Sequence, residues 1–184
     1  MRTMAYTLHK VFKSLYEKIT INMEMLEQIR EIEKNSELPI VLLPTHRSYI
    51  DFLLISYVFF VYKLRLPNFI ADEAILQARF LPFIIKSCGA FFFQKKEYKD
   101  SNLYRIIFDK YIELLLKQGS TVQFFIEGNR SRTGKILAPN FEILNVVLDS
   151  IVFGKVNDVC LIPMTVNYEK VLEGDTFPGE LLGE

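Results

Sequence analysis

Five short apolar runs alternate with longer stretches of helical period along this chain. This alternation limits the fold classes that the chain can adopt. The apolar runs predict strands at 40–43, 68–71, 89–93, 121–126 and 159–166. Apolar residues at helical spacing predict helices at 51–62, 73–87 with a break at Pro82, 101–117 and 140–153. Strands joined by helices require crossover connections. We therefore predict an α/β fold in which a largely parallel or mixed central sheet is flanked by helices.

The first 36 residues lack a strand signal and instead show apolar positions every three or four residues from Leu8 to Ile32. This period predicts one or two amphipathic helices that end near Asn35 and pack on the rest of the chain. We therefore divide the sequence into an N-terminal helical segment, 1–36, and one domain, 37–184.

Composition excludes several classes of function. Lys plus Arg and Asp plus Glu each number 22, so no overall positive field attracts nucleic acid, and no nucleic-acid partner is expected. The only histidines are His9 and His46, and no Cys-x-x-Cys occurs, so no metal site is expected. Cys88 and Cys160 lie among apolar residues and are expected to be reduced core residues.

His46 follows the apolar run 40–43 and is separated from Asp51 by four residues. A histidine whose ring is held by a carboxylate can take a proton from an alcohol near neutral pH. The sequence contains no Gly-x-Ser-x-Gly elbow, so a serine nucleophile is not indicated. The pair therefore suits activation of a substrate hydroxyl. The alternative is purely structural, with His46 bonded to its own Asp51 at a helix start where Ser48 is the expected cap.

A second polar loop, 127–135, follows the apolar residues Phe124, Phe125 and Ile126. Arg130 and Arg132 in this loop favour an anion site, because guanidinium groups match phosphate oxygens. The loop is not a P-loop, since its glycine spacing is wrong and an isoleucine follows Gly-Lys. A solvated charged turn is the alternative. At the carboxyl ends of parallel strands, this loop and His46 are expected to meet.

Together and in this order, four segments resemble the glycerolipid acyltransferases, which transfer a fatty acyl group from acyl-CoA to a phosphorylated three-carbon acceptor. The first segment, His46 to Asp51, matches His-x4-Asp. The second segment, 89–95, is similar to Gly-Ala-Phe-Phe-x-Arg-Arg. The third, 125–135, is similar to Phe-x-Glu-Gly-Thr-Arg-Ser-Arg-x-Gly-Lys, and the fourth, 162–168, to a block with a proline and a tyrosine. The likeness is strongest to dihydroxyacetone phosphate acyltransferases of ether-lipid synthesis, followed by glycerol-3-phosphate acyltransferases.

The resemblance implies that His46 is the general base on the acceptor hydroxyl and Asp51 its orienting partner. It also implies a substrate-binding set made of Arg47, Lys95, Glu127, Gly128, Arg130, Ser131, Arg132 and Pro163. Within that set, Arg130 and Arg132 are the expected phosphate ligands. Acyl-CoA is the expected co-substrate, no cofactor or metal is implied, and direct transfer is favoured over an acyl-enzyme because neither cysteine lies in a reactive context.

Two departures from the family pattern bear on this interpretation. Gln94 and Lys95 stand where the family has paired arginines, and Asn129 replaces a threonine. The chain, which ends at Glu184, is also shorter than most members, so we leave open that it is C-terminally truncated. These departures favour the alternative, a non-catalytic lipid-phosphate or CoA-binding module. A hydrolase that uses the same histidine with water is a third possibility.

Because the product of such a reaction is a lipid, the enzyme is expected to act at a membrane. No apolar run reaches the roughly twenty residues that a membrane-spanning helix needs. We therefore expect an intracellular, peripheral membrane protein of phospholipid or ether-lipid biosynthesis. Its membrane-facing surface is expected at 52–62 or 80–93, and burial in the core is the other interpretation of these two apolar segments. The sequence does not choose between peroxisome, mitochondrion and endoplasmic reticulum.

Overall fold

The computed structural model describes residues 2–72, 81–131, 133–174, 179 and 182. A five-stranded sheet in the order β3-β2-β4-β1-β5 forms its centre, and every neighbouring pair of strands is parallel. The strands are β1 (Ile40–Pro44), β2 (Asn68–Asp72), β3 (Ala90–Phe93), β4 (Val122–Gln123) and β5 (Cys160–Met164). The predicted parallel α/β architecture is confirmed.

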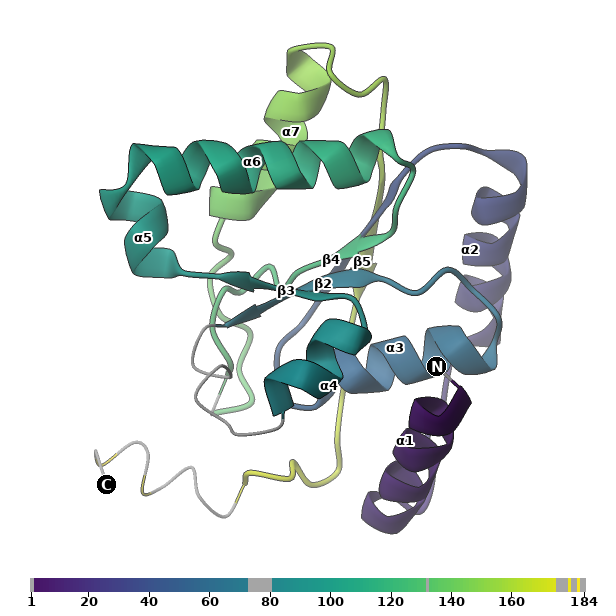
Figure 1. Cartoon of the computed structure of the whole chain (residues 1–184). Helices are drawn as coiled ribbons and strands as arrows, with labels where there is room; N and C mark the ends of the chain where they lie inside the picture. The colour runs from purple at the N-terminus through teal and green to yellow at the C-terminus, as the bar shows by residue number, and fades with distance from the viewer. Residues whose placement is uncertain (1, 73–80, 132, 175–178, 180–181, 183–184) are drawn as a thin grey trace.

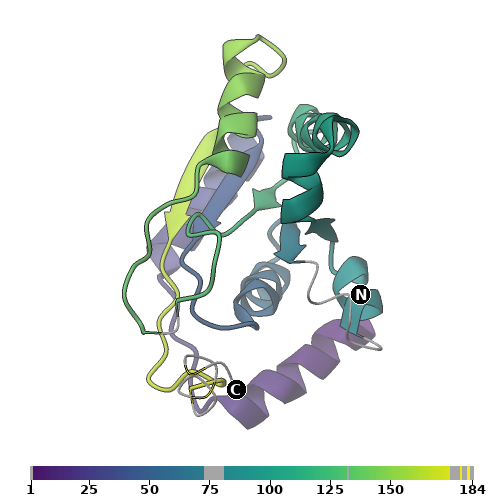
Figure 2. The ribbon, with the colours of Figure 1, turned by 90° about the vertical axis from the view of Figure 1, so that its left-hand side faces the viewer.

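Helices connect the strands and cover both faces of the sheet. They are α1 (Arg2–Leu15), α2 (Met23–Asn35), α3 (Asp51–Val61), α4 (Leu81–Ser87), α5 (Lys95–Asp100), α6 (Asn102–Lys117) and α7 (Glu142–Val152). Figure 1 shows α6 and α7 above the sheet and α3 and α4 below it, and Figure 2 shows the same layers after a quarter turn. A parallel pair cannot be joined by a tight turn, which is why each connection carries a helix.

Side chains of successive strand residues alternate between the two faces, and this places two sets of core residues. Val41 packs with Phe108, Ile112 and Val147 under α6 and α7. Its neighbour Leu42 points the other way and packs with residues of α2 and α3 that include Ile29, Ile55 and Phe59. The second helix of the N-terminal segment therefore buries its apolar face directly on the sheet, as its helical period predicts.

Most predicted elements agree with the structure to within two residues, and the differences have local causes. The predicted strand 121–126 contributes only Val122–Gln123 to the ladder. Beyond Phe124 the chain bends, because Gly128 N–H donates to the carbonyl of Phe125. Helix α5 was not predicted, since its six residues carry no apolar period. Residues 73–80, predicted to be helical, lie outside the described residues.

Ser48 is not the helix cap that the sequence favours. The residue before α3 is Ile50, and no side chain of that residue caps the helix. The hydroxyl of Ser48 instead donates to the carboxylate of Glu173, at 2.8 Å from Oε2. The carboxylate that accepts the N–H groups at this helix start is Asp51, as described below.

The segment 52–62 does not form the exposed apolar surface that we expected. Phe52, Ile55 and Phe59 are buried in the core, because α3 lies under the sheet. In the other expected segment, 80–93, Phe83 is 79% exposed. A larger exposed apolar set lies on α6 and consists of Leu103, Ile106, Ile107, Tyr111 and Leu114. Among the described helices, none is both long enough and apolar enough to cross a membrane.

Candidate active site

Strand β1 delivers the first candidate segment to the carboxyl end of the sheet, where it is tied to the chain beyond β5. Thr45 N–H donates to the carbonyl of Met164 at 3.0 Å, and Thr45 Oγ1 accepts from the N–H of Val166 at 3.1 Å. The first contact continues the β1–β5 ladder beyond Pro44, and the second joins the Thr45 side chain to the segment after β5. They fix the backbone immediately before His46.

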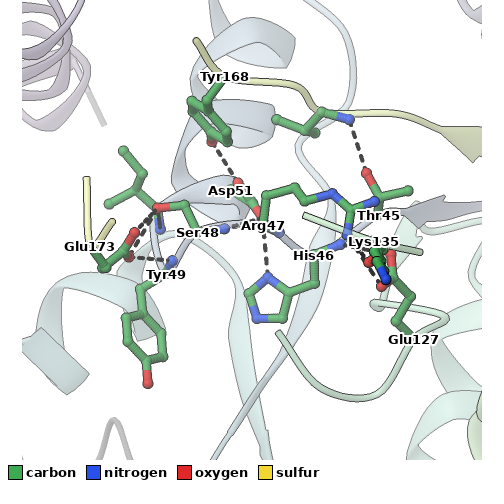
Figure 3. A network of polar contacts seen from close by, with 12 residues as sticks. Thr45, His46, Arg47, Ser48, Tyr49, Asp51, Glu127, Lys135, Tyr168 and Glu173 are labelled. Carbon is green, nitrogen blue, oxygen red and sulfur yellow. Dashed lines mark hydrogen bonds and ion pairs between the residues drawn. The ribbon is translucent and has the colours of Figure 1, made fainter. Parts of the chain in front are cut away.

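Asp51 is the centre of the hydrogen-bond network that follows (Figure 3). Its Oδ2 atom lies 3.1 Å from Nδ1 of His46 and accepts the N–H groups of Arg47 at 2.6 Å and Ser48 at 2.9 Å. The side chain of Asp51 is fully buried. These three contacts hold the carboxylate in place.

The second carboxylate oxygen of Asp51 accepts a hydrogen bond from the hydroxyl of Tyr168, with an O–O distance of 2.5 Å. Tyr168 lies four residues beyond β5, so the contact joins the first and fourth candidate segments. Burial and the neighbouring carboxylate of Asp51 raise the pKa of Tyr168 above its ordinary value. The phenol is therefore protonated at neutral pH and acts as the donor.

The imidazole of His46 is oriented by a stacking contact on its face as well as by the Asp51 contact at its edge. It stacks on the ring of Phe125 with centroids 3.8 Å apart and an interplanar angle of 9°. The side chain remains 14% exposed, and its second ring nitrogen points away from Asp51 (Figure 3). If Nδ1 donates to Asp51, the other nitrogen is left as an acceptor, which is the tautomer a general base requires.

Glu127 connects the second polar loop to His46 and Arg47. Its carboxylate is 3.4 Å from the backbone nitrogen of His46, 3.5 Å from the guanidinium of Arg47 and 3.0 Å from the backbone nitrogen of Leu137. Only 1% of its side chain is exposed. The guanidinium of Arg47 also donates to the carbonyl of Lys135 at 3.0 Å. Both charged groups therefore bind protein groups in this structure.

The loop that follows Glu127 lies against His46 through its backbone. Ser131 N–H donates to the carbonyl of His46 at 2.9 Å, and the Ser131 hydroxyl donates to the carbonyl of Lys135 at 2.5 Å. Gly128 has a φ of +66°, and a Cβ there would meet Asn140 Cβ at 3.0 Å. A left-handed backbone and close packing both favour glycine at this turn.

Arg130 lies over the ring of Tyr49, with Cζ 3.9 Å from the ring centroid. Tyr49 is half exposed, and it belongs to the first candidate segment. The contact places a guanidinium next to the His46 loop, where a cation–π interaction holds it. Arg132, the other predicted phosphate ligand, lies outside the described residues.

Glu173, near the C-terminal end of the described chain, binds the segment that contains His46 and Asp51. It accepts from the Ser48 hydroxyl and from the backbone N–H of Tyr49, the latter at 2.7 Å (Figure 3). These bonds hold the segment after β5 against the start of α3, next to the Tyr168–Asp51 contact. Glu173 was not among the predicted site residues, because its partner Ser48 lies 125 residues earlier in the chain.

The remaining predicted site residues lie at the two edges of the sheet. Pro163 is exposed on the edge strand β5 and pairs in register with Leu43, in agreement with the edge position expected for a strand proline. Lys95 is exposed at the first position of α5, directly after the opposite edge strand β3. Three strand spacings of about 4.8 Å, roughly 14 Å, separate β3 from β1.

Tyr168 and Phe125 both contact the central pair, and neither was among the predicted site residues. Each lies inside a segment that carried the family resemblance, so the segments contained the signal. The individual contacts became visible only with the fold, since Tyr168 is 117 positions from Asp51.

The thiol groups do not form a nucleophilic site. Burial raises the pKa of Cys88 and of Cys160, which disfavours the reactive thiolate. Neither Cys88 nor Cys160 forms a disulfide. Across the described ranges, no group of three or more His, Cys, Asp and Glu side chains is arranged to hold a metal ion.

Comparison with known proteins agrees with the resemblance carried by the four segments. The dihydroxyacetone phosphate acyltransferase of Homo sapiens is 37% identical over the whole of this chain, which covers 27% of that protein. A glycerol-3-phosphate acyltransferase of Pseudomonas aeruginosa is 36% identical over 94% of this chain and 20% of its own length. The chain thus spans about a quarter of the length of the curated relatives it matches.

Among solved structures, the chain is similar to the 1-acyl-sn-glycerophosphate acyltransferase of Thermotoga maritima. It superposes with a TM-score of 0.44 at 15% identity, over 89% of this chain and 79% of that one. The Acyltransferase family model matches residues 20–167, which contain the first three candidate segments and all of the fourth except Tyr168. The chain therefore belongs to the Acyltransferase family.

Proposed function

We propose that this domain is an acyl-CoA-dependent O-acyltransferase that esterifies the hydroxyl of dihydroxyacetone phosphate or glycerol-3-phosphate. The observation that supports it most directly is the His46–Asp51 pair, in which a buried carboxylate binds one ring nitrogen at 3.1 Å and the other nitrogen points away from it. Relatives of this chain carry the names of both enzymes, which supports either acceptor.

In the proposed reaction, the free ring nitrogen of His46 takes the proton of the acceptor hydroxyl as its oxygen attacks the thioester carbonyl. The new C–O bond forms, the C–S bond breaks, and the CoA thiolate leaves and takes the proton from the His46 imidazolium, which restores the neutral base. Asp51 stabilises the imidazolium that forms in between. Direct transfer is favoured over an acyl-enzyme, because burial raises the pKa of both thiols.

The acceptor phosphate is proposed to bind near Arg130. The guanidinium of Arg130 lies on Tyr49, and the next residue, Ser131, donates its N–H to the carbonyl of His46. A phosphate at this guanidinium would place the rest of a three-carbon acceptor next to the imidazole. Arg47 and Glu127 are better suited to hold the two loops together, because their charged groups bind each other and backbone atoms.

We further propose that the domain works at an intracellular membrane surface, because its product is a lipid and its donor carries a fatty acyl chain. The proposed role is in phospholipid synthesis, or in ether-lipid synthesis if dihydroxyacetone phosphate is the acceptor. Co-sedimentation with phospholipid vesicles tests the membrane part. Protein that stays in the supernatant with both neutral and anionic vesicles would contradict it.

The test of the reaction is CoA release from palmitoyl-CoA by the purified protein, with dihydroxyacetone phosphate, glycerol-3-phosphate or no acceptor. We expect acceptor-dependent release together with an ester product, and we expect His46→Ala to abolish both. His9→Ala is the matched control, since His9 is exposed on α1 and bonds to the hydroxyl of Tyr57 at 2.7 Å. It should leave turnover unchanged.

Two outcomes would replace this proposal with another. CoA release that does not depend on an acceptor but still depends on His46 would indicate a hydrolase. Folded protein that binds palmitoyl-CoA and releases no CoA with either acceptor would indicate a binding module, which the Gln94 and Lys95 departures from the family pattern also favour.

A further inference from the structure

The carboxylate of Asp51 has two oxygens, and the contact with His46 uses only one of them. Oδ2 binds His46, Arg47 and Ser48, all within the same short segment. Oδ1 binds the hydroxyl of Tyr168, which comes from the other end of the chain. A carboxylate held at one oxygen alone could rotate about its bond to Cβ and weaken its contact with the imidazole.

Tyr168 is well placed to prevent that rotation. Its hydroxyl lies 2.5 Å from Oδ1, and the side chain of Asp51 is fully buried, so water does not replace the phenol readily. Burial and the charge of Asp51 raise the pKa of Tyr168, which keeps the phenol protonated. The position of Tyr168 is set in turn by β5, whose extension is bonded to Thr45 next to His46.

We propose that Tyr168 is a positioning residue for the His46–Asp51 pair, a role that rests on the acyl transfer proposed above. Its hydroxyl fixes the plane of the carboxylate, so that Oδ2 stays directed at Nδ1 of His46. Tyr168 does not contact the reacting atoms in this arrangement. It acts through Asp51, as groups bonded to a catalytic or metal-bound side chain commonly do.

A second tyrosine provides a matched comparison within the same cluster. Tyr16, in the link between α1 and α2, packs on the ring of Tyr168 with centroids 5.7 Å apart. Its hydroxyl is buried but has no hydrogen-bond partner among the described residues. Tyr16→Phe and Tyr168→Phe therefore remove the same atom from two adjacent rings, and only the second change removes a bond to Asp51.

The test measures both variants for kcat, for the KM of palmitoyl-CoA and acceptor, and for the pH dependence of turnover. Tyr168→Phe should lower kcat by about 10-fold to 100-fold with both KM values unchanged, because a buried charged acceptor loses one donor. A carboxylate that turns away from the imidazole stabilises the protonated ring of His46 less, so the acidic limb of the pH profile should move to lower pH. Tyr16→Phe should match the wild type in every respect.

A second readout does not depend on activity. The ring N–H signals of His46 in nitrogen-15 spectra, identified by their loss in His46→Ala, report the contact with Asp51 directly. They should move in Tyr168→Phe and stay in place in Tyr16→Phe. Wild-type protein without turnover would refute the proposed reaction, and these spectra would still decide the positioning role.

Three results would overturn the positioning role. The first is a Tyr168→Phe variant with wild-type kcat and unchanged His46 signals. The second is an equal loss of activity in both variants, which would indicate ring packing. The third is a rise in KM at constant kcat, which would make Tyr168 a substrate-binding residue. Thermal unfolding of each variant shows whether the fold is retained.

Discussion

The described part of the chain contains two hydrogen-bonded tyrosine–aspartate pairs, and one of them belongs to the candidate active site. Tyr168 donates to Asp51 beside His46, whereas Tyr98 of α5 donates to Asp109 of α6 at 2.9 Å. Burial raises the pKa of both phenols, so both act as donors. The carboxylates differ, since Asp51 also binds an imidazole and two backbone N–H groups while the second pair joins two helices.

The comparison shows that a tyrosine–carboxylate bond has no catalytic meaning by itself. At the end of β1 the carboxylate orients a base that is still partly exposed, and a loop with cationic groups lies next to it. At the α5–α6 corner the same bond lies under exposed helix residues, and it fixes the packing of Tyr98 on Phe108. The two corners can therefore be separated by experiment.

The largest expected difference comes from removing the charge of each carboxylate. Asp51→Asn keeps the shape of the side chain but replaces the carboxylate, which contacts His46, Arg47 and Ser48, with a neutral amide. The amide no longer stabilises an imidazolium. We expect kcat to fall by about 10³-fold to 10⁴-fold, as for the equivalent change in a Ser-His-Asp triad. Asp109→Asn should leave kcat unchanged. Equal effects of the two substitutions would remove the distinction between the corners.

Glu127→Ala tests whether the site depends on the buried link between its two loops. Removing a buried carboxylate that binds Arg47 and two backbone nitrogens should lower the free energy of unfolding by about 3 kcal/mol, measured by urea denaturation. The control is Glu27→Ala, which removes the exposed Arg30–Glu27 pair on α2 and should cost less than about 1 kcal/mol. Similar costs would contradict a supporting role for Glu127.

The sequence was sufficient to place the main elements and the first half of the site. Apolar runs and helical period located the strands and most helices, and His46 and Asp51 lie close enough in sequence to be paired by spacing alone. Tyr168, Phe125 and Glu173 were not predicted, because their contacts depend on which strands are neighbours. A strand order of β3-β2-β4-β1-β5 is not encoded in any local pattern.

The same argument applies to Lys95, which the resemblance placed in the substrate-binding set together with Arg130. Both residues lie in polar segments that follow an apolar run. In the fold, β4 is adjacent to β1, whereas β3 is the far edge strand.

Lys95→Ala therefore asks whether the α5–α6 corner contributes to binding. If its ammonium contacts a phosphate of either substrate, KM should rise about two- to fivefold at constant kcat, the range expected for one exposed ion pair. The increase should shrink in high salt, because ions screen such a contact. Lys96→Ala is the neighbouring control. Identical KM values for wild type and both variants would exclude Lys95 from the binding site.

The smallest effect is expected on α6 and appears only in acid. The carboxylate of Glu113 binds the ammonium groups of Lys117, Lys110 and Lys155, which lower its pKa to about 2 from 4.5. A lowered pKa in the folded state stabilises the protein above the unfolded value and not below the folded one. The stabilisation is therefore complete above pH 4.5 and is lost as the pH falls toward about 2.

Thermal unfolding of wild type and Glu113→Gln across this pH range measures the effect. The difference in melting temperature should be constant from pH 7 to pH 5 and should decrease steadily below that. Glu31→Gln, on the exposed side of α2, provides the control for removing one surface carboxylate. A difference that is independent of pH would mean that Glu113 stabilises α6 through packing rather than charge, and the α5–α6 corner would then owe its stability to Tyr98 and Phe108 alone.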